Sequence, residues 1–147
     1  MGDFNYKGMT RWKMTGISAL EKKLDDMMDE KKANAVLYPV MQNASNKVLS
    51  KLKQDMLVFR DTGATINEAI VENPKMDKHG VRMVKLGWSS TGSKQRWRMI
   101  HLNEYGYTRY GRRYNPRGMG VIGRSVDSSM PQYQKDLERG IKQWLKI

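Results

Sequence analysis

Apolar residues recur every three or four positions in three stretches of the chain, and this spacing predicts helices. The first helix is expected to begin at Ser18, where Ser-Ala-Leu-Glu has the spacing of a capping box. The second covers residues 33–59, with Pro39 as a kink, a break or a first-turn residue. The third begins near Pro131. The apolar positions are, in chain order, Leu20, Leu24, Met27 and Met28; Met41, Ala44, Val48, Leu52 and Met56; and Tyr133, Leu137, Ile141 and Trp144.

Alternation of polar and apolar residues predicts short strands between these helices. Residues 11–15 alternate in this way and are typical of an edge strand. Residues 65–88 resemble a strand pair with a polar turn that ends at Gly80, and its second strand is expected to be partly buried.

The region before the third helix is richer in glycine and predicts smaller elements. Residues 96–105 are expected to form a short helix that Gly106 stops, and residues 107–114 a small hairpin with Gly111 in its middle. Residues 119–126 are expected to form a compact turn or helix. This order of elements predicts an α+β fold, with N-terminal and C-terminal helices packed on a small antiparallel sheet.

Length and composition set the class of protein. The 147 residues fit a single domain over 11–147, preceded by a flexible or docking arm over 1–10. The chain has no cysteine, no apolar run long enough for a membrane span and no recognisable signal peptide. Its net charge of +12 is expected to attract polyanions, of which nucleic acid is the commonest, or acidic protein partners.

A basic stretch gives this charge a location. No acidic residue occurs between Glu104 and Asp127, and tyrosines alternate with the arginines there. Arginine forks pair with phosphates and aromatic rings stack on bases or guanidinium planes, so the stretch predicts a loop that contacts DNA or an acidic partner. Tyrosine and arginine are equally typical of protein–protein interfaces, so both alternatives stay open. The arginines of this predicted DNA- or partner-contacting loop are Arg109, Arg112, Arg113, Arg117 and Arg124.

A second motif raises an enzymatic alternative. Asp61-Thr62-Gly63 matches the active-site sequence of retroviral-type aspartic proteases, and residues 121–124 resemble their second conserved segment. However, Asp61 follows a lysine-rich helical segment instead of a buried strand, which favours a structural turn at Asp61, Thr62 and Gly63. No metal-ligand spacing, phosphate-binding loop or cofactor motif is recognisable, so we expect no catalytic, metal or cofactor site.

Four segments together resemble the bacteriophage tail-completion, or head–tail joining (neck), proteins, the family that includes the minor tail protein Z of phage lambda. Residues 61–70 (DTGATINEAI) resemble the family's DTG-A-L…I signature, although the leucine is displaced to Ile66. Residues 96–106 (RWRMIHLNEYG) resemble its aromatic segment ending in E-G, and residues 111–124 its P-x-x-M-G-x-I-x-R stretch. Residues 15–20 match its G-x-x-x-L start.

This resemblance implies a structural virion protein that completes the tail, joins it to the head and forms part of the DNA channel. It implies a homo-oligomeric ring of six-fold symmetry, whose partners are tail terminator or tail tube proteins, head-connector proteins and double-stranded DNA. The expected location is the head–tail junction of the virion, and the host cytoplasm during assembly. The alternative is a sequence-nonspecific nucleic-acid-binding protein, which the charge alone would also predict.

Overall fold

Strand β5 (Arg82–Trp88) is the central strand of an antiparallel sheet in the computed structural model, which describes residues 2–4, 10–15, 18–59, 63–89 and 100–145. On one edge it pairs with β2 (Thr10–Thr15), which pairs in turn with β1 (Gly2–Phe4). On the other edge it pairs with β3 (Ala69–Val71) and with β4 (Lys75–Met76). Neighbouring strands on both edges leave β5 buried along most of its length.

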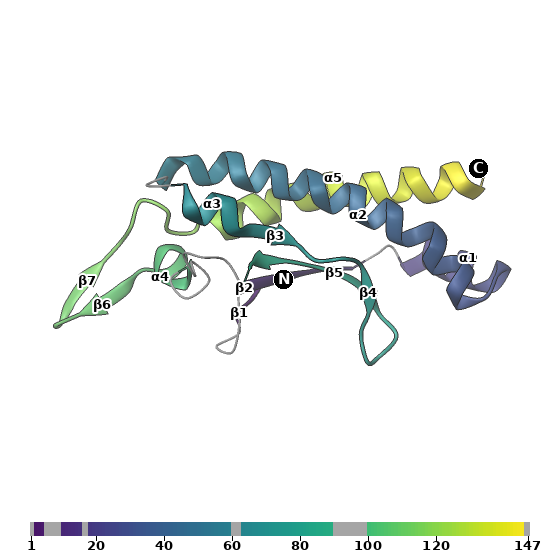
Figure 1. Cartoon of the computed structure of the whole chain (residues 1–147), viewed down its shortest axis with the longest axis horizontal. Helices are drawn as coiled ribbons and strands as arrows, with labels where there is room; N and C mark the ends of the chain where they lie inside the picture. The colour runs from purple at the N-terminus through teal and green to yellow at the C-terminus, as the bar shows by residue number, and fades with distance from the viewer. Residues whose placement is uncertain (1, 5–9, 16–17, 60–62, 90–99, 146–147) are drawn as a thin grey trace.

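Two long helices lie along one face of this sheet (Figure 1). Helix α2 (Glu30–Asp55) and helix α5 (Val121–Leu145) run antiparallel, and they make the most extensive contact between any two elements of the described chain. The Cβ that a residue other than glycine would carry at Gly140 would lie 2.5 Å from a methyl group of Val40. The missing side chain at Gly140 therefore lets the two helices approach closely.

The remaining elements are short. Helix α1 (Ser18–Met27) precedes α2, and the 3₁₀ turn η1 (Met56–Phe59) follows it. Helix α3 (Ala64–Glu68) leads into β3, and helix α4 (Ile100–Tyr105) leads into the hairpin of β6 and β7. The fold is therefore α+β, with helices from both ends of the chain packed on a small antiparallel sheet, as the sequence predicted.

The core lies between the sheet and the α2–α5 pair. Trp88 is its largest fully buried side chain, and its indole N–H donates a 2.8 Å hydrogen bond to the carbonyl oxygen of Thr65, which ties the end of β5 to α3. The apolar positions predicted for residues 33–59 are all buried, which confirms the buried face of α2 and of the η1 turn that follows it. The buried apolar residues of the cluster are Leu24, Ala33, Leu37, Met41, Ala44, Val48, Leu52, Met56, Ala69, Val84, Leu86, Trp88, Ile122, Val126, Tyr133, Leu137 and Ile141.

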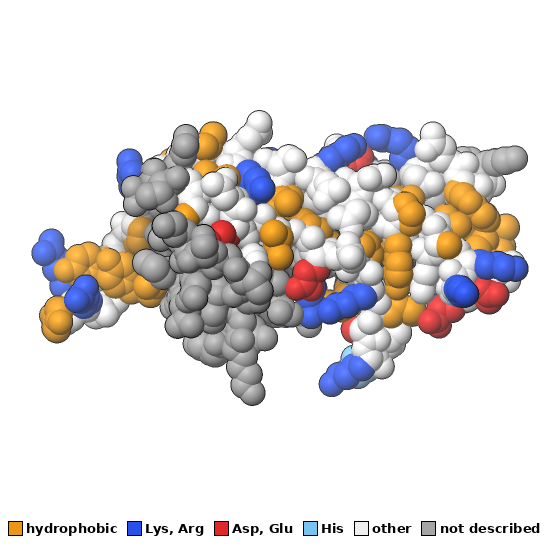
Figure 2. Space-filling view, viewed as in Figure 1, with side chains coloured by type: hydrophobic (Ala, Val, Ile, Leu, Met, Phe, Trp, Pro, Cys, Tyr) orange, Lys and Arg blue, Asp and Glu red, His pale blue; other side chains and the backbone are white. Residues whose placement is uncertain are grey.

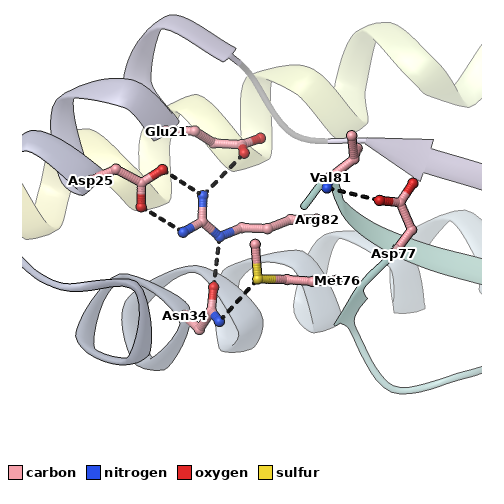
Figure 3. A network of polar contacts seen from close by, with 7 residues as sticks. All are labelled: Glu21, Asp25, Asn34, Met76, Asp77, Val81 and Arg82. Atoms are coloured by element: carbon pink, nitrogen blue, oxygen red, sulfur yellow. Dashed lines mark hydrogen bonds and ion pairs between the residues drawn. The ribbon is translucent and has the colours of Figure 1, made fainter. Parts of the chain in front are cut away.

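A buried arginine connects the sheet to the first two helices (Figure 3). Arg82, on β5, donates to both carboxylate oxygens of Asp25 at 2.6 and 3.1 Å and to Glu21 at 3.3 Å, and both acids belong to α1. Its Nε–H donates to Asn34 of α2 at 2.7 Å. Through its hydrogen bond and its charge, Arg82 holds the pKa of Asp25 below the usual value, because the bonded carboxylate is favoured over the acid.

The structure overturns one local prediction and refines several others. Strand β2 pairs on both edges, so it is not the edge strand predicted for residues 11–15. Helix α5 begins at Val121, so most of the turn or helix predicted over 119–126 is helical and is continuous with the predicted C-terminal helix, with Pro131 in the interior. Pro39 lies inside the continuous helix α2, which excludes a break or a first-turn position for it. Part of the predicted N-terminal arm, Gly2–Phe4, forms β1.

Candidate contact surface at the β6–β7 hairpin

Helix α5 begins against a carboxylate from another element. Glu104, near the end of α4, is 5% exposed, and its carboxylate oxygens each accept a 2.9 Å hydrogen bond, from the backbone N–H groups of Ile122 and Gly123. These groups belong to the first turn of α5, where N–H groups have no partner within the helix and negative charge is favoured. The backbone N–H of Gly120 also donates to the Glu104 carbonyl oxygen at 2.8 Å.

The electrostatics of Glu104 reflect this position. Burial raises the pKa of the Glu104 carboxyl, while the two N–H donors and the charge of Arg124 act in the opposite direction with smaller effect. A Cβ at Gly123 would lie 2.8 Å from the Glu104 carboxylate, so a glycine is needed for the carboxylate to approach the helix backbone. Glu104 therefore fixes both ends of the segment 105–120, which contains the hairpin.

Strands β6 (Tyr107–Arg109) and β7 (Arg112–Tyr114) form a separate two-stranded sheet that projects from one end of the molecule (Figure 1). Tyr110 and Gly111 join them with φ values of +51° and +75°, and positive φ at both central residues is what a type I′ hairpin turn requires. The rings of Tyr107 and Tyr114 stack across the strands at 5.0 Å. The hairpin predicted for residues 107–114 is thus confirmed.

Tyr110, the first residue of the turn, has a backbone conformation that is unusual for tyrosine. Tyr110 is the only residue other than glycine with positive φ in the described chain, and its side chain is 92% exposed. A left-handed backbone costs an L-residue such as tyrosine roughly 1–2 kcal/mol. Asparagine and glycine are the residues that fit this turn position best. The guanidinium of Arg109 lies 5.2 Å from the ring centroid, and a cation–π contact at an exposed site contributes only about 0.5–1 kcal/mol, so it offsets part of that cost.

The structure divides the five predicted arginines into two groups. Arg113 donates a 2.6 Å hydrogen bond to the carbonyl oxygen of Tyr105, and Arg124 donates to that of Met119 at 3.3 Å, so both brace the base of the hairpin. All five arginines are exposed, and none has an ion pair with an acidic side chain among the described residues. The two groups differ because Arg113 and Arg124 donate to backbone carbonyl oxygens, whereas Arg109, Arg112 and Arg117 have no such bond within the described part of the chain.

Two of the exposed arginines form a pair. Arg109 and Arg112 are direct partners in the β6–β7 register, so their side chains leave the same face of the hairpin. The guanidinium of Arg109 lies 5.2 Å from the ring centroid of Tyr110, and that of Arg112 lies 5.4 Å from the ring centroid of Tyr114. Like charges directly opposite one another destabilise a strand pair. We call these two residues the arginine pair.

The other predicted site residues lie elsewhere. Gly63 has a φ of +88° and caps the start of α3, while Asp61 and Thr62 lie outside the described residues. The segment 121–124, compared above with a protease motif, forms the first turn of α5.

Glu104 had no predicted role, although one signal for it is present in the sequence. It is the last acidic residue before a stretch of five arginines without an acid, and it stands where a short helix was expected to end.

The grooves between α2 and α5 offer a different chemistry. One, of about 350 Å³, is lined by Lys51, Asp55 and the first turns of α5, and Lys51 pairs with Asp55 at 2.7 Å. In the next groove along, Lys47 pairs with Asp136 at 3.6 Å. These lysines have acidic partners, so the exposed arginines of the hairpin are the better candidates for contact with an anionic ligand.

Comparison with known proteins assigns no family to this chain. No family model, curated protein or solved structure matches the chain. Within the described residues, no group of three or more His, Cys, Asp or Glu side chains is placed to hold a metal ion. The described helices include none that is both long and apolar enough to cross a membrane.

Proposed function

We propose that this protein is a non-enzymatic structural subunit of a bacteriophage neck, which completes the tail and joins it to the head. The observation that carries the proposal is the projecting β6–β7 hairpin, with its strained and exposed Tyr110 and its unpaired arginines. The resemblance of four segments to tail-completion proteins supplies the biological setting. The hairpin supplies a structural reason to expect assembly.

The hairpin has features that favour a bound partner. An isolated two-stranded hairpin is only marginally stable in water, and this one has additional costs at its turn and at its arginine pair. Contact with another macromolecule would offset these costs, since tyrosine and arginine are the residues that contribute most at interfaces. Figure 2 displays apolar and basic side chains together at this end of the molecule.

Further exposed apolar residues belong to the same region. Leu57 and Val58 of η1 follow α2 at the end where α2 meets the first turns of α5. Tyr105 and Met119 flank the base of the hairpin and are also exposed. An apolar surface bordered by arginine is typical of a protein–protein contact. We infer that this end meets the tail terminator, the tail tube or head-connector proteins, or a neighbouring copy in a ring of the six-fold symmetry that the resemblance implies.

The alternative function is a sequence-nonspecific nucleic-acid-binding protein that works as a monomer or dimer. The observation that favours it is the net charge of +12 together with five exposed arginines that have no acidic partner among the described residues. The two functions differ in what the isolated chain does. A neck subunit assembles and binds DNA weakly when alone, whereas a dedicated nucleic-acid binder binds DNA tightly and remains small.

Native mass spectrometry tests the proposal, with the chain alone and after mixing with isolated phage tails. A ring, or a defined number of copies retained on the tail end, is expected. Tyr110→Ser should weaken this assembly, while Trp144→Ser, which removes an exposed aromatic from the far end of α5, should leave it intact. A chain that stays monomeric or dimeric and ignores tails would contradict the neck function and favour the nucleic-acid binder.

A further inference from the structure

We infer that the arginine pair, Arg109 and Arg112, is a binding site for the phosphate backbone of double-stranded DNA, with Arg117 as an additional contact. This inference rests on the proposed function and deepens it, because it names a ligand for the arginine pair. It also narrows the predicted basic loop from five arginines to three. Arg113 and Arg124 hold the hairpin in place and are not expected to contact the ligand directly.

The two arginines of the pair are cross-strand neighbours. Arg109 and Arg112 lie opposite one another beside the turn, so two positive charges share one face of a narrow hairpin. In the free chain they repel one another. A phosphate between them would accept hydrogen bonds from both guanidinium groups and remove the repulsion. The arrangement is therefore more favourable with an anion bound than without one.

A tyrosine ring lies near each guanidinium group of the pair, Tyr110 at 5.2 Å from Arg109 and Tyr114 at 5.4 Å from Arg112. A cation–π contact of this kind uses the ring as its partner and no hydrogen-bond acceptor, so guanidinium N–H groups remain available to a phosphate. It also restricts the long side chain before binding, which reduces the entropy lost when a phosphate is bound. Phosphate oxygens accept hydrogen bonds from such N–H groups in pairs.

Double-stranded DNA is a better candidate than a second copy of this chain for the anion that binds the arginine pair. A second copy of this chain is a poor ligand for the pair, because the exposed acids at the α1–α2 corner are interspersed with Lys22, Lys23, Lys31 and Lys32. The segment 105–126 has five arginines and no acid, and the whole chain has an excess of twelve positive charges. A charge excess of this size favours a polyanion with repeated charges over a single carboxylate. Duplex DNA is such a ligand.

The test is a titration of fluorescently labelled duplex DNA with the full chain at several salt concentrations, using two unrelated sequences. We expect weak binding that is equal for both sequences and falls steeply with salt. Each phosphate contact contributes about 0.9 to the slope of log K against log salt, so Arg109→Gln/Arg112→Gln should lower that slope by about 2. Binding at physiological salt should fall roughly ten- to thirty-fold. Each single variant should give about half of the slope change.

The matched control is Lys22→Gln/Lys23→Gln, which removes the same two charges from exposed positions on α1. An equal loss of slope in this control would overturn the inference, since binding would then depend on net charge and not on the pair. Unchanged binding in Arg109→Gln/Arg112→Gln would also overturn it and would assign the hairpin to a protein partner. Circular dichroism checks that each variant is folded, and removing the like-charge repulsion should favour folding.

The two proposals fail separately. If the wild-type chain assembles on tails but the arginine-pair variant binds DNA as well as wild type does, the phosphate site is wrong and the neck function stands. If the chain ignores tails but the slope change appears, the phosphate site stands and the neck function is wrong.

Discussion

The carboxylate of Glu104 accepts the backbone N–H of Ile122 at 2.9 Å, across a separation of 18 residues in the chain. This bond, with the equivalent bond from Gly123, gives helix α5 a cap that comes from α4 and not from its own preceding residues. The cap closes a loop over the β6–β7 hairpin, so one side chain determines where the exposed arginines stand relative to the helical body. Positioning of the contact surface and stability of the fold therefore depend on the same residue.

Replacing Glu104 with alanine should destabilise the protein by about 1–2 kcal/mol, the usual effect of removing a helix N-cap. A buried N–H group at Ile122 and a partly buried one at Gly123 would lose their acceptors. Urea denaturation measures the change, with Glu138→Ala as a control. Glu138 has only an exposed ion pair with Lys142, so its removal should change the free energy of unfolding by less than about 0.5 kcal/mol. Equal effects in the two variants would contradict the capping role.

The pH dependence of stability should report Glu104 separately. Burial raises its pKa above the ordinary value of 4.5, so the folded chain holds this proton to higher pH than the unfolded chain does. The resulting contribution is present in full below pH 4.5 and is lost as the pH rises through the folded-state pKa. The stability of wild type minus that of Glu104→Gln should therefore fall across this window. A difference that rises instead would mean that the N–H donors outweigh burial.

How far the sequence predicted this region depends on the range of the interactions. The hairpin was predictable because Gly111 and the alternating residues around it are local signals. Glu104 was not assigned a role, because its partners at 122 and 123 are brought near only by the packing of α5. The division of the arginines was equally hidden. Arg113 and Arg124 differ from Arg109 because the fold places a backbone carbonyl oxygen within hydrogen-bond distance of each of them.

The same distinction holds in the body of the fold. The buried face of α2 followed from its periodicity, since a helix of 26 residues repeats its pattern many times. Pro131 was interpreted as a helix start, but Val126 before it and Tyr133 after it are both buried, and this packing outweighs the local preference of proline. Arg82 alternates with apolar residues like a solvent-facing strand residue. Its burial is explained by its polar partners from other elements, the acids of α1 and Asn34 of α2.

Arg82→Met should destabilise the protein by roughly 1.5–3 kcal/mol, the range for hydrogen bonds that involve charged groups. Arg82 is 2% exposed, but the Asp25 side chain is 44% exposed and would be solvated after the loss, so the larger penalty for a fully buried pair does not apply. Thermal and urea unfolding measure the effect. Lys142→Met removes an ion pair with Glu138 in which the two side chains are 46% and 47% exposed, so it should change little. A comparable loss in both variants would contradict the anchoring role of Arg82.

Two glycines of the hairpin region provide a matched pair. Gly106 and Gly111 have φ values of +71° and +75°, so alanine is strained at both. A Cβ at Gly106 would also lie 2.7 Å from Arg113 Nη2 and 2.8 Å from the Tyr114 carbonyl oxygen, whereas nothing lies within 4 Å at Gly111. Gly106→Ala should therefore be the more destabilising, by about 1 kcal/mol beyond the shared strain. Equal losses in unfolding experiments would contradict the close packing of Arg113.

Tyr110→Asn should change the stability of the hairpin and its binding to phage tails in opposite directions. Asparagine tolerates the left-handed conformation that Tyr110 adopts at φ +51°, so the hairpin of the isolated chain should become more stable by about 0.5–1 kcal/mol. Amide hydrogen exchange in β6 and β7 measures the stability of the hairpin itself, to which global unfolding experiments are insensitive. The same variant loses the exposed ring and the contact with Arg109, so retention on phage tails should fall. A variant that is both more protected and fully retained would indicate that Tyr110 does not contact the partner. A variant that is less protected would contradict the strain at the turn.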